Sequence, residues 1–163
     1  MGIINVIICG CTKNSSNYIQ SEINNLLKIK SLFAQFDIVI YENDSNDNTV
    51  EILRLLESEN KLKLITESNI QDKLKHRTMI MAHGRNKLVE YVLSANKYDY
   101  MIMVDLDGIT KDFNTQGIID AFNYKLDSWD VLTSNCNNKY YDIWALRINK
   151  PYWGHVHSKI WDR

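Results

Sequence analysis

The sequence predicts an α/β fold with a mostly parallel central sheet and helices on both faces. Short apolar runs rich in β-branched residues alternate with longer segments whose apolar residues recur every three or four positions. This alternation favours parallel strands joined by crossover helices. No internal repeat or low-complexity linker divides the chain. We therefore expect one domain over residues 1–163.

Each expected element follows from one of these patterns. Strands are expected at 3–8, 37–41, 62–65 and 100–104, and helices at 19–36, 50–57 and 74–93. Two further strands of mixed direction are expected at 130–134 and 140–147. Right-handed crossovers bring the loops after parallel strands to one edge of the sheet, where ligands bind in open α/β folds.

The composition is that of an ordinary globular domain, with 45% hydrophobic and 24% charged residues. A net charge of -1 gives no overall attraction for nucleic acid, which we do not expect as a partner. No apolar stretch approaches the about 18 residues that a membrane span needs. The N-terminus also lacks the basic and long apolar regions of a signal peptide.

The cysteines Cys9, Cys11 and Cys136 show neither metal-ligand spacing nor a disulfide framework. Reduced cysteines are typical of a reducing compartment, so we expect a cytoplasmic protein. The chain ends abruptly in an aromatic, histidine-rich segment at 152–163, which suggests a domain cut from a longer protein.

The strongest local motif is the strand at 100–104 followed by Asp105, Leu106, Asp107 and Gly108. Acids beside an apolar strand are costly unless they are paired or bind a metal. Carboxylates at such a position suit a hard cation, Mg²⁺ or Mn²⁺, which can neutralise a diphosphate leaving group. The alternative is an ordinary acidic turn.

A second strand runs into acids and small polar residues between Glu42 and Thr49. Glu42 and Asp44 are candidates for ligand binding, whereas part of the cluster is expected to cap the next helix. A third segment, 73–86, is basic, and its Arg77 and Arg85 could line a diphosphate site because guanidinium groups match phosphate oxygens. A solvated basic helix face is the alternative.

The fourth segment, 129–147, combines paired tyrosines, tryptophans and acids, a surface suited to sugar rings. Asp142 is our candidate for the general base that takes the acceptor proton in an inverting mechanism. Aromatic core packing is the alternative for this segment. Asp130 is the competing acid, and Asp142 could instead hold hydroxyls of the donor sugar or pair with Arg147. His155 and His157 would face the same side of an extended segment and could complete a metal shell.

Taken in order, these motifs resemble those of the GT-A glycosyltransferases. Residues 41–49 are similar to the Val-Asp-Asp-Gly-Ser-x-Asp-x-Thr element of the large inverting family, and 81–86 to its Ala-Arg-Asn element. Residues 105–107 are similar to its Asp-x-Asp motif. Residues 140–147 are closer to fungal capsule-associated mannosyltransferases and related enzymes of large DNA viruses.

The resemblance implies a GT-A domain that moves a sugar from a nucleotide-diphosphate donor, a UDP- or GDP-sugar, to a glycan or other hydroxyl acceptor. Glu42 would contact the base or ribose, and Arg85 would lie in the donor site. Asp105 would touch the ribose or metal, and Asp107 would ligate the metal. Asp44 replaces a glycine of the larger family. The first-loop segment 9–13, which begins at Cys9, would lie against the nucleoside.

Two other functions compete with this one. A sugar nucleotidyltransferase has a related architecture, but it has a loop after the first strand that is richer in glycine and arginine than residues 10–16. A nucleotide-sugar-binding module without catalysis is the third possibility, and turnover would distinguish it from an enzyme.

Overall fold

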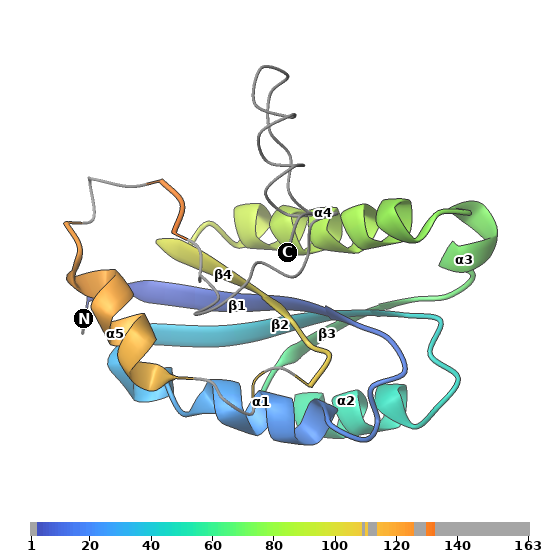
Figure 1. The fold of residues 1–163 in the computed structure, drawn as a ribbon, viewed down its shortest axis with the longest axis horizontal. Coiled ribbons are helices and arrows are strands. Elements are labelled where there is room, and N and C mark those ends of the chain that lie inside the picture. Colours follow the sequence, from blue (N-terminus) through green and yellow to red (C-terminus); the bar gives the residue numbers. More distant parts are fainter. Residues whose placement is uncertain (1–2, 109, 111–113, 126–129, 133–163) are drawn as a thin grey trace, which may run out of the picture. The chain divides into compact units, whose positions relative to one another are not determined.

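The computed structural model describes residues 3–108, 110, 114–125 and 130–132 (Figure 1). The chain divides into two compact units, Met1–Tyr124 and Lys125–Arg163. Every helix and strand described below belongs to the first unit. One domain over the whole chain stays a prediction.

An all-parallel sheet forms the centre of the first unit (Figure 1). Its order among the described residues is β3-β2-β1-β4. The strands are β1 Asn5–Thr12, β2 Gln35–Asn43, β3 Lys63–Glu67 and β4 Tyr100–Asp105. The predicted α/β class is confirmed, and each of the four strands expected between residues 3 and 104 is present.

Helices cover both faces of this sheet (Figure 1). The helices α1 Ile19–Leu27, α2 Thr49–Ser58 and α5 Thr115–Asn123 lie on one face, and α4 Arg77–Ala95 lies on the other, preceded by the short α3 Ile70–Lys73. Successive residues of β1 point to opposite faces, as strand geometry requires. Ile8 therefore packs in the core with α1 and α2, whereas Ile7 packs with Leu88 of α4.

The bounds of several elements differ from the sequence prediction. The expected helix 19–36 is wrong beyond Leu27, because a 3-10 turn, Lys30–Leu32, follows and β2 begins at Gln35. The apolar side chain of Phe36 fits the helical spacing, but its backbone pairs with Val6 of β1. Strand β1 also extends to Thr12, four residues beyond the expected end.

Helix α5 was not expected from the sequence. The side chain of Asn114 accepts a hydrogen bond from the backbone N–H of Gln116, so it caps the helix. Ile118 and Phe122 then pack against the core from one face of α5. Residues 130–132 are not in a strand, and the rest of the strands expected at 130–134 and 140–147 lies outside the described residues.

No described helix combines the length and apolar character needed to cross a membrane. Cys9 and Cys11 are both free thiols. The cytoplasmic location stays a prediction.

Candidate functional site

The strand order identifies the edge of the sheet where a ligand would bind. The chain moves outward from β1 to β2 and β3, and then crosses to β4 on the other side of β1. In open α/β sheets the binding crevice lies at the carboxyl ends of the strands, where this direction reverses. Here that point lies between β1 and β4, where Cys11 pairs with Asp105.

Both acids of the Asp-x-Asp motif lie at this point. Asp105 ends β4, and its Oδ1 accepts a hydrogen bond from Nη2 of Arg85 at 3.0 Å. Asp107 is exposed and forms no hydrogen bond or ion pair with the described residues. Burial raises the pKa of the Tyr18 hydroxyl, and the second largest cause that raises it is the charge of Asp107. Asp107 therefore lies near Tyr18, in the segment between β1 and α1.

Helix α4 contacts all four strands at this edge through three consecutive residues. A Cβ atom on Gly84 would lie 2.6 Å from the ring of Tyr41 in β2 and 3.1 Å from Sγ of Cys11 in β1. The missing side chain therefore lets α4 approach the sheet closely. On either side of Gly84, His83 bonds to Glu67 at the end of β3, and Arg85 reaches Asp105 at the end of β4.

The cluster of Tyr41, Glu67 and His83 was not expected from the sequence. Oε2 of Glu67 accepts a hydrogen bond from the Tyr41 hydroxyl at 2.8 Å and lies 2.6 Å from Nε2 of His83. Burial raises the pKa of Glu67, but the hydrogen bonds from Tyr41 and His83 outweigh burial and hold this pKa below its ordinary value. The available signal was that Glu67 ends its strand, as Asp105 does.

Glu42 is 1% exposed at the end of β2, and both of its carboxylate oxygens have protein partners. Oε1 accepts from the backbone N–H of Ser45, and Oε2 accepts from the Thr66 hydroxyl, both at 2.8 Å. Glu42 thus orders the loop after β2. Each carboxylate oxygen can accept a further hydrogen bond, and its predicted contact with a nucleoside stays a prediction.

Asp44 has a left-handed backbone, with φ of 53°. Its carboxylate accepts the backbone N–H groups of Asn69 at 2.6 Å and Gln71 at 3.0 Å. Burial raises the pKa of Asp44, and the hydrogen bonds outweigh it and lower the pKa overall. Asp44 therefore joins the loop after β2 to the start of α3, and donor contact stays a prediction.

The loops after β1 and β2 are joined by hydrogen bonds. Each bond pairs a backbone N–H of one loop with a side-chain oxygen of the other loop or of the helix that follows it. The bonds run from Asn14 to Ser45 (2.9 Å), Asn46 to Asn14 (2.9 Å), Ser15 to Thr49 (2.7 Å) and Ser16 to Asp47 (3.1 Å). The two loops therefore form one ordered surface, which we call the loop network.

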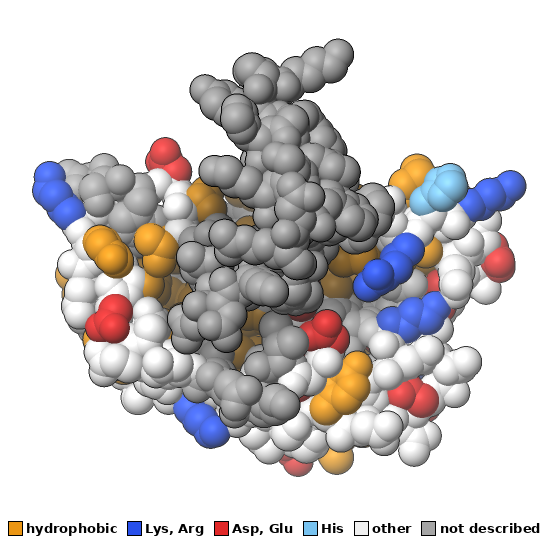
Figure 2. All heavy atoms as spheres, viewed as in Figure 1, with side chains coloured by type: hydrophobic (Ala, Val, Ile, Leu, Met, Phe, Trp, Pro, Cys, Tyr) orange, Lys and Arg blue, Asp and Glu red, His pale blue; other side chains and the backbone are white. Residues whose placement is uncertain are grey.

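Basic side chains lie beside this surface. Lys73, Lys75 and Arg77 are exposed at α3 and at the start of α4, and Lys13 of the first loop donates to Gln71 of α3 at 2.6 Å. Figure 2 shows blue and pale-blue side chains gathered where Figure 1 places α3 and the beginning of α4. The predicted role of Arg77 in donor binding stays a prediction.

One predicted contact is wrong. Cys9 lies inside β1 rather than in a loop, and its side chain is 0% exposed in the core under α4. It cannot touch a ligand from this position. The loop after β1 begins at Lys13, because the strand ends at Thr12. Asp142, His155 and His157 lie outside the described residues.

The described residues contain no group of three or more histidines, cysteines or acids that could hold a metal ion alone. A cation at Asp105 and Asp107 would therefore need further ligands from outside the described residues. Diphosphate oxygens and water are ligands that Mg²⁺ accepts.

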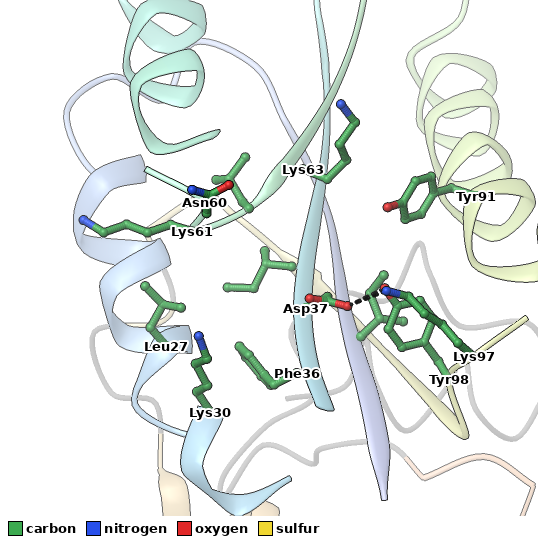
Figure 3. Close-up of a pocket in the computed structure, with 13 residues that line it drawn as sticks. Leu27, Lys30, Phe36, Asp37, Asn60, Lys61, Lys63, Tyr91, Lys97 and Tyr98 are labelled. Atoms are coloured by element: carbon green, nitrogen blue, oxygen red, sulfur yellow. Dashed lines mark hydrogen bonds and ion pairs between the residues drawn. The ribbon is translucent and has the colours of Figure 1, made fainter. Parts of the chain in front are cut away.

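A cavity of about 280 Å³ lies at the opposite edge of the sheet (Figure 3). Figure 3 shows Asp37 beside Lys97 and Tyr98, and its Oδ2 accepts from both, at 3.1 and 2.7 Å. The one acid in this lining is thus bonded within the protein, and the cavity is far from the carboxyl ends of the strands.

Solved structures of S. aureus TarS are similar to this chain. TarS 1-349 in complex with UDP, and in complex with UDP-GlcNAc, each match 73% of this chain at 23% identity and a TM-score of 0.45. Another TarS structure matches 64% of it at 24% identity and a TM-score of 0.43. The chain spans 17% to 32% of the length of these structures. No family model and no curated protein matches the sequence.

Proposed function

We propose that this chain is a metal-dependent glycosyltransferase, which moves a sugar from a nucleotide diphosphate to a hydroxyl group of a glycan or other acceptor. One observation carries the proposal. The exposed Asp107 carboxylate forms no hydrogen bond or ion pair with the described residues. It follows the Asp105–Arg85 pair at the point between β1 and β4 where the order of the strands reverses. Acids and a guanidinium group together suit a ligand that carries phosphate and a bound cation.

The two acids fit a cation of a particular kind. Mg²⁺ is usually bound by one or two carboxylates together with substrate phosphates and water. Asp107 and Asp105 would hold Mg²⁺ or Mn²⁺, which would neutralise the charge that develops on the diphosphate leaving group. Such a site needs no third acid or histidine from the described residues, although His155 or His157 would be able to complete it.

The remaining residues would bind and orient the donor. Arg85 uses Nη2 for Asp105, and its other N–H groups are the donors that would bind phosphate oxygens. Arg77 and Lys13 would add positive charge beside the same edge. Glu42 would accept from the base or ribose while it orders the loop after β2.

Asp142 is the proposed general base for the acceptor hydroxyl. The variant Asp142→Asn keeps the shape of the side chain and removes its basicity. In an inverting enzyme, transfer should fall by about 10²–10⁴-fold while donor affinity persists. Nearly normal transfer in this variant would place the base elsewhere or indicate a retaining mechanism.

Donor binding can be tested by thermal unfolding with UDP-, GDP- and dTDP-sugars, with and without Mn²⁺. A ligand at 100 times its Kd stabilises a protein by about 2.7 kcal/mol. For a chain of this size that raises Tm by about 5–10 °C. The variant Asp107→Ala should abolish the part of the shift that requires Mn²⁺.

The matched control is Asp120→Ala, which removes an exposed acid from α5 whose described bond is to Gln116 on the same helix. It should keep the full Mn²⁺-dependent shift. The same shift in Asp107→Ala and wild type would contradict the metal site. Donor binding without sugar transfer would indicate a binding module, and release of a nucleoside triphosphate from the sugar nucleotide and pyrophosphate would indicate a nucleotidyltransferase.

A further inference from the structure

A buried acid of α1 holds the segment that follows the Asp-x-Asp motif. Oε1 of Glu22 accepts two hydrogen bonds from Thr110, one from its backbone N–H at 2.9 Å and one from its hydroxyl at 2.7 Å. Nδ2 of Asn25, also on α1, donates to the Thr110 carbonyl oxygen at 3.1 Å. Every polar group of Thr110 is therefore bonded to α1. We call these three residues the Thr110 clamp.

Burial makes the clamp strong. Glu22 is 2% exposed and Thr110 is 4% exposed, so water cannot replace either partner. A buried donor that is left without a partner is costly. Removal of the Glu22 carboxylate would leave both the N–H and the hydroxyl of Thr110 without their acceptor.

The same segment is fixed a second time, before Asp107. Leu106 is 3% exposed and packs in the core, where its Cδ1 lies 2.5 Å from the position that a Cβ on Gly10 would take. Asp107 thus lies between a residue buried in the core and a residue bonded to α1. Gly108, between Asp107 and Thr110, has φ of 94°, which lets the chain turn there at no steric cost.

We propose that Glu22 is a positioning residue, which fixes the direction of the Asp107 carboxylate by holding Thr110. The role of Asp107 in binding a cation and a diphosphate rests on the proposed function. The geometry of the clamp does not depend on it. Oε2 of Glu22 is buried and has no hydrogen-bond partner among the described residues. Both hydrogen bonds from Thr110 go to Oε1 of Glu22, and the side-chain amide oxygen of a glutamine could accept them in its place.

The test compares Glu22→Ala with Glu22→Gln in the full chain, and uses Thr110→Val as a milder variant should Glu22→Ala not fold. Amide hydrogen exchange of Thr110, whose backbone N–H is bonded to Glu22, reports whether the segment is held. We expect Glu22→Ala to speed this exchange by about 10- to 100-fold, the factor that corresponds to leaving buried donors without their acceptor. Glu22→Gln should stay within a few-fold of wild type. Leu56→Ala on α2, which destabilises the core without touching the clamp, controls for general loosening.

A second measurement reports on positioning. UDP and GDP affinities are determined with and without Mn²⁺ in the wild type, Glu22→Ala, Asp107→Ala and the double variant. We expect Glu22→Ala to weaken Mn²⁺-dependent binding about tenfold and to leave metal-free binding within twofold. In the Asp107→Ala background, Glu22→Ala should cause no further loss, because coupled residues show non-additive effects.

Wild-type exchange rates in Glu22→Ala would overturn the clamp. Faster exchange with unchanged Mn²⁺-dependent affinity, in a protein where Asp107→Ala loses that affinity, would overturn positioning. If Asp107→Ala binds as the wild type does, the proposed metal site fails. The exchange rates then decide alone whether Glu22 holds the segment.

Discussion

The contact between α4 and the sheet at Gly84 makes a quantitative prediction. A Cβ added at Gly84 would lie 2.6 Å from Cδ1 and 2.8 Å from Cε1 of Tyr41, whereas ordinary contacts begin at 3.4 Å. Either α4 or the ring must move by about 0.8 Å to restore contact distance. The ring cannot move freely, because Tyr41 is 1% exposed and its hydroxyl is bonded to Glu67.

Two opposing effects set the free energy of unfolding of Gly84→Ala. Replacing glycine by alanine inside a helix stabilises it by up to about 1 kcal/mol. Overpacking of a rigid contact costs about 1–3 kcal/mol. Gly117 provides the matched control, since it also lies in a helix, α5, and nothing lies within 4 Å of the position that a Cβ would take there. Gly117→Ala should therefore show the stabilising effect alone.

The difference between the two variants isolates the steric cost. Gly84→Ala should be less stable than Gly117→Ala by about 1–3 kcal/mol, which is about 2–12 °C in Tm for a chain of this size. Thermal and urea unfolding of both variants measure this difference. Equal stability of the two variants would refute the reasoning, because it would mean that α4 does not approach the sheet at Gly84.

Three other predictions follow from buried or bonded side chains. The hydrogen bond from the Thr49 side chain, opposed by slight burial, lowers the pKa of Asp47 below its ordinary value of 3.8. Ionised Asp47 therefore contributes its full share to the free energy of unfolding above pH 3.8, and this share is lost as the pH falls below that value. Asp47→Asn should remove this acidic part of the dependence of stability on pH. Leu106→Ala should lower the free energy of unfolding by about 2–5 kcal/mol in urea titrations, because Leu106 is 3% exposed in the core, and a loss under about 1 kcal/mol would contradict its burial. Burial, together with the charge of Cys11, raises the pKa of Cys9 to about 12, so in a Cys136→Ser variant Cys9 should alkylate slowly at about pH 8 until the protein is unfolded.

The strands were predictable because their apolar runs are short and rich in β-branched residues, and no helical pattern competes with them. The end of α1 was not predictable, since the residues after Leu27 keep a helical spacing of apolar side chains while Phe36 belongs to β2. The spacing of apolar residues cannot show this end, because the backbone of Phe36 pairs with β1, a contact between segments that are distant in the sequence.

The positions of the acids in the candidate site could be predicted from the sequence, but the side chains that bond to them could not. Asp105 and Asp107 follow an apolar strand, and the parallel topology then determines the edge at which they lie. The bond from Arg85 depends on the close approach of α4 at Gly84, which no local pattern indicates. Glu22 reads as an ordinary helix residue in the sequence, although its place among Ile19, Ile23 and Leu26 on the buried face of α1 was an available signal.

The loop network has a consequence for recognition. Backbone N–H groups of the first two loops are bonded to side chains across the gap between them in the free protein. Ordering a flexible loop costs conformational entropy, and that cost is subtracted from the free energy of association. Since these loops are already ordered in the free protein, a ligand that bound this edge would avoid most of this cost, and its affinity would depend mainly on how well its shape fits the ordered surface.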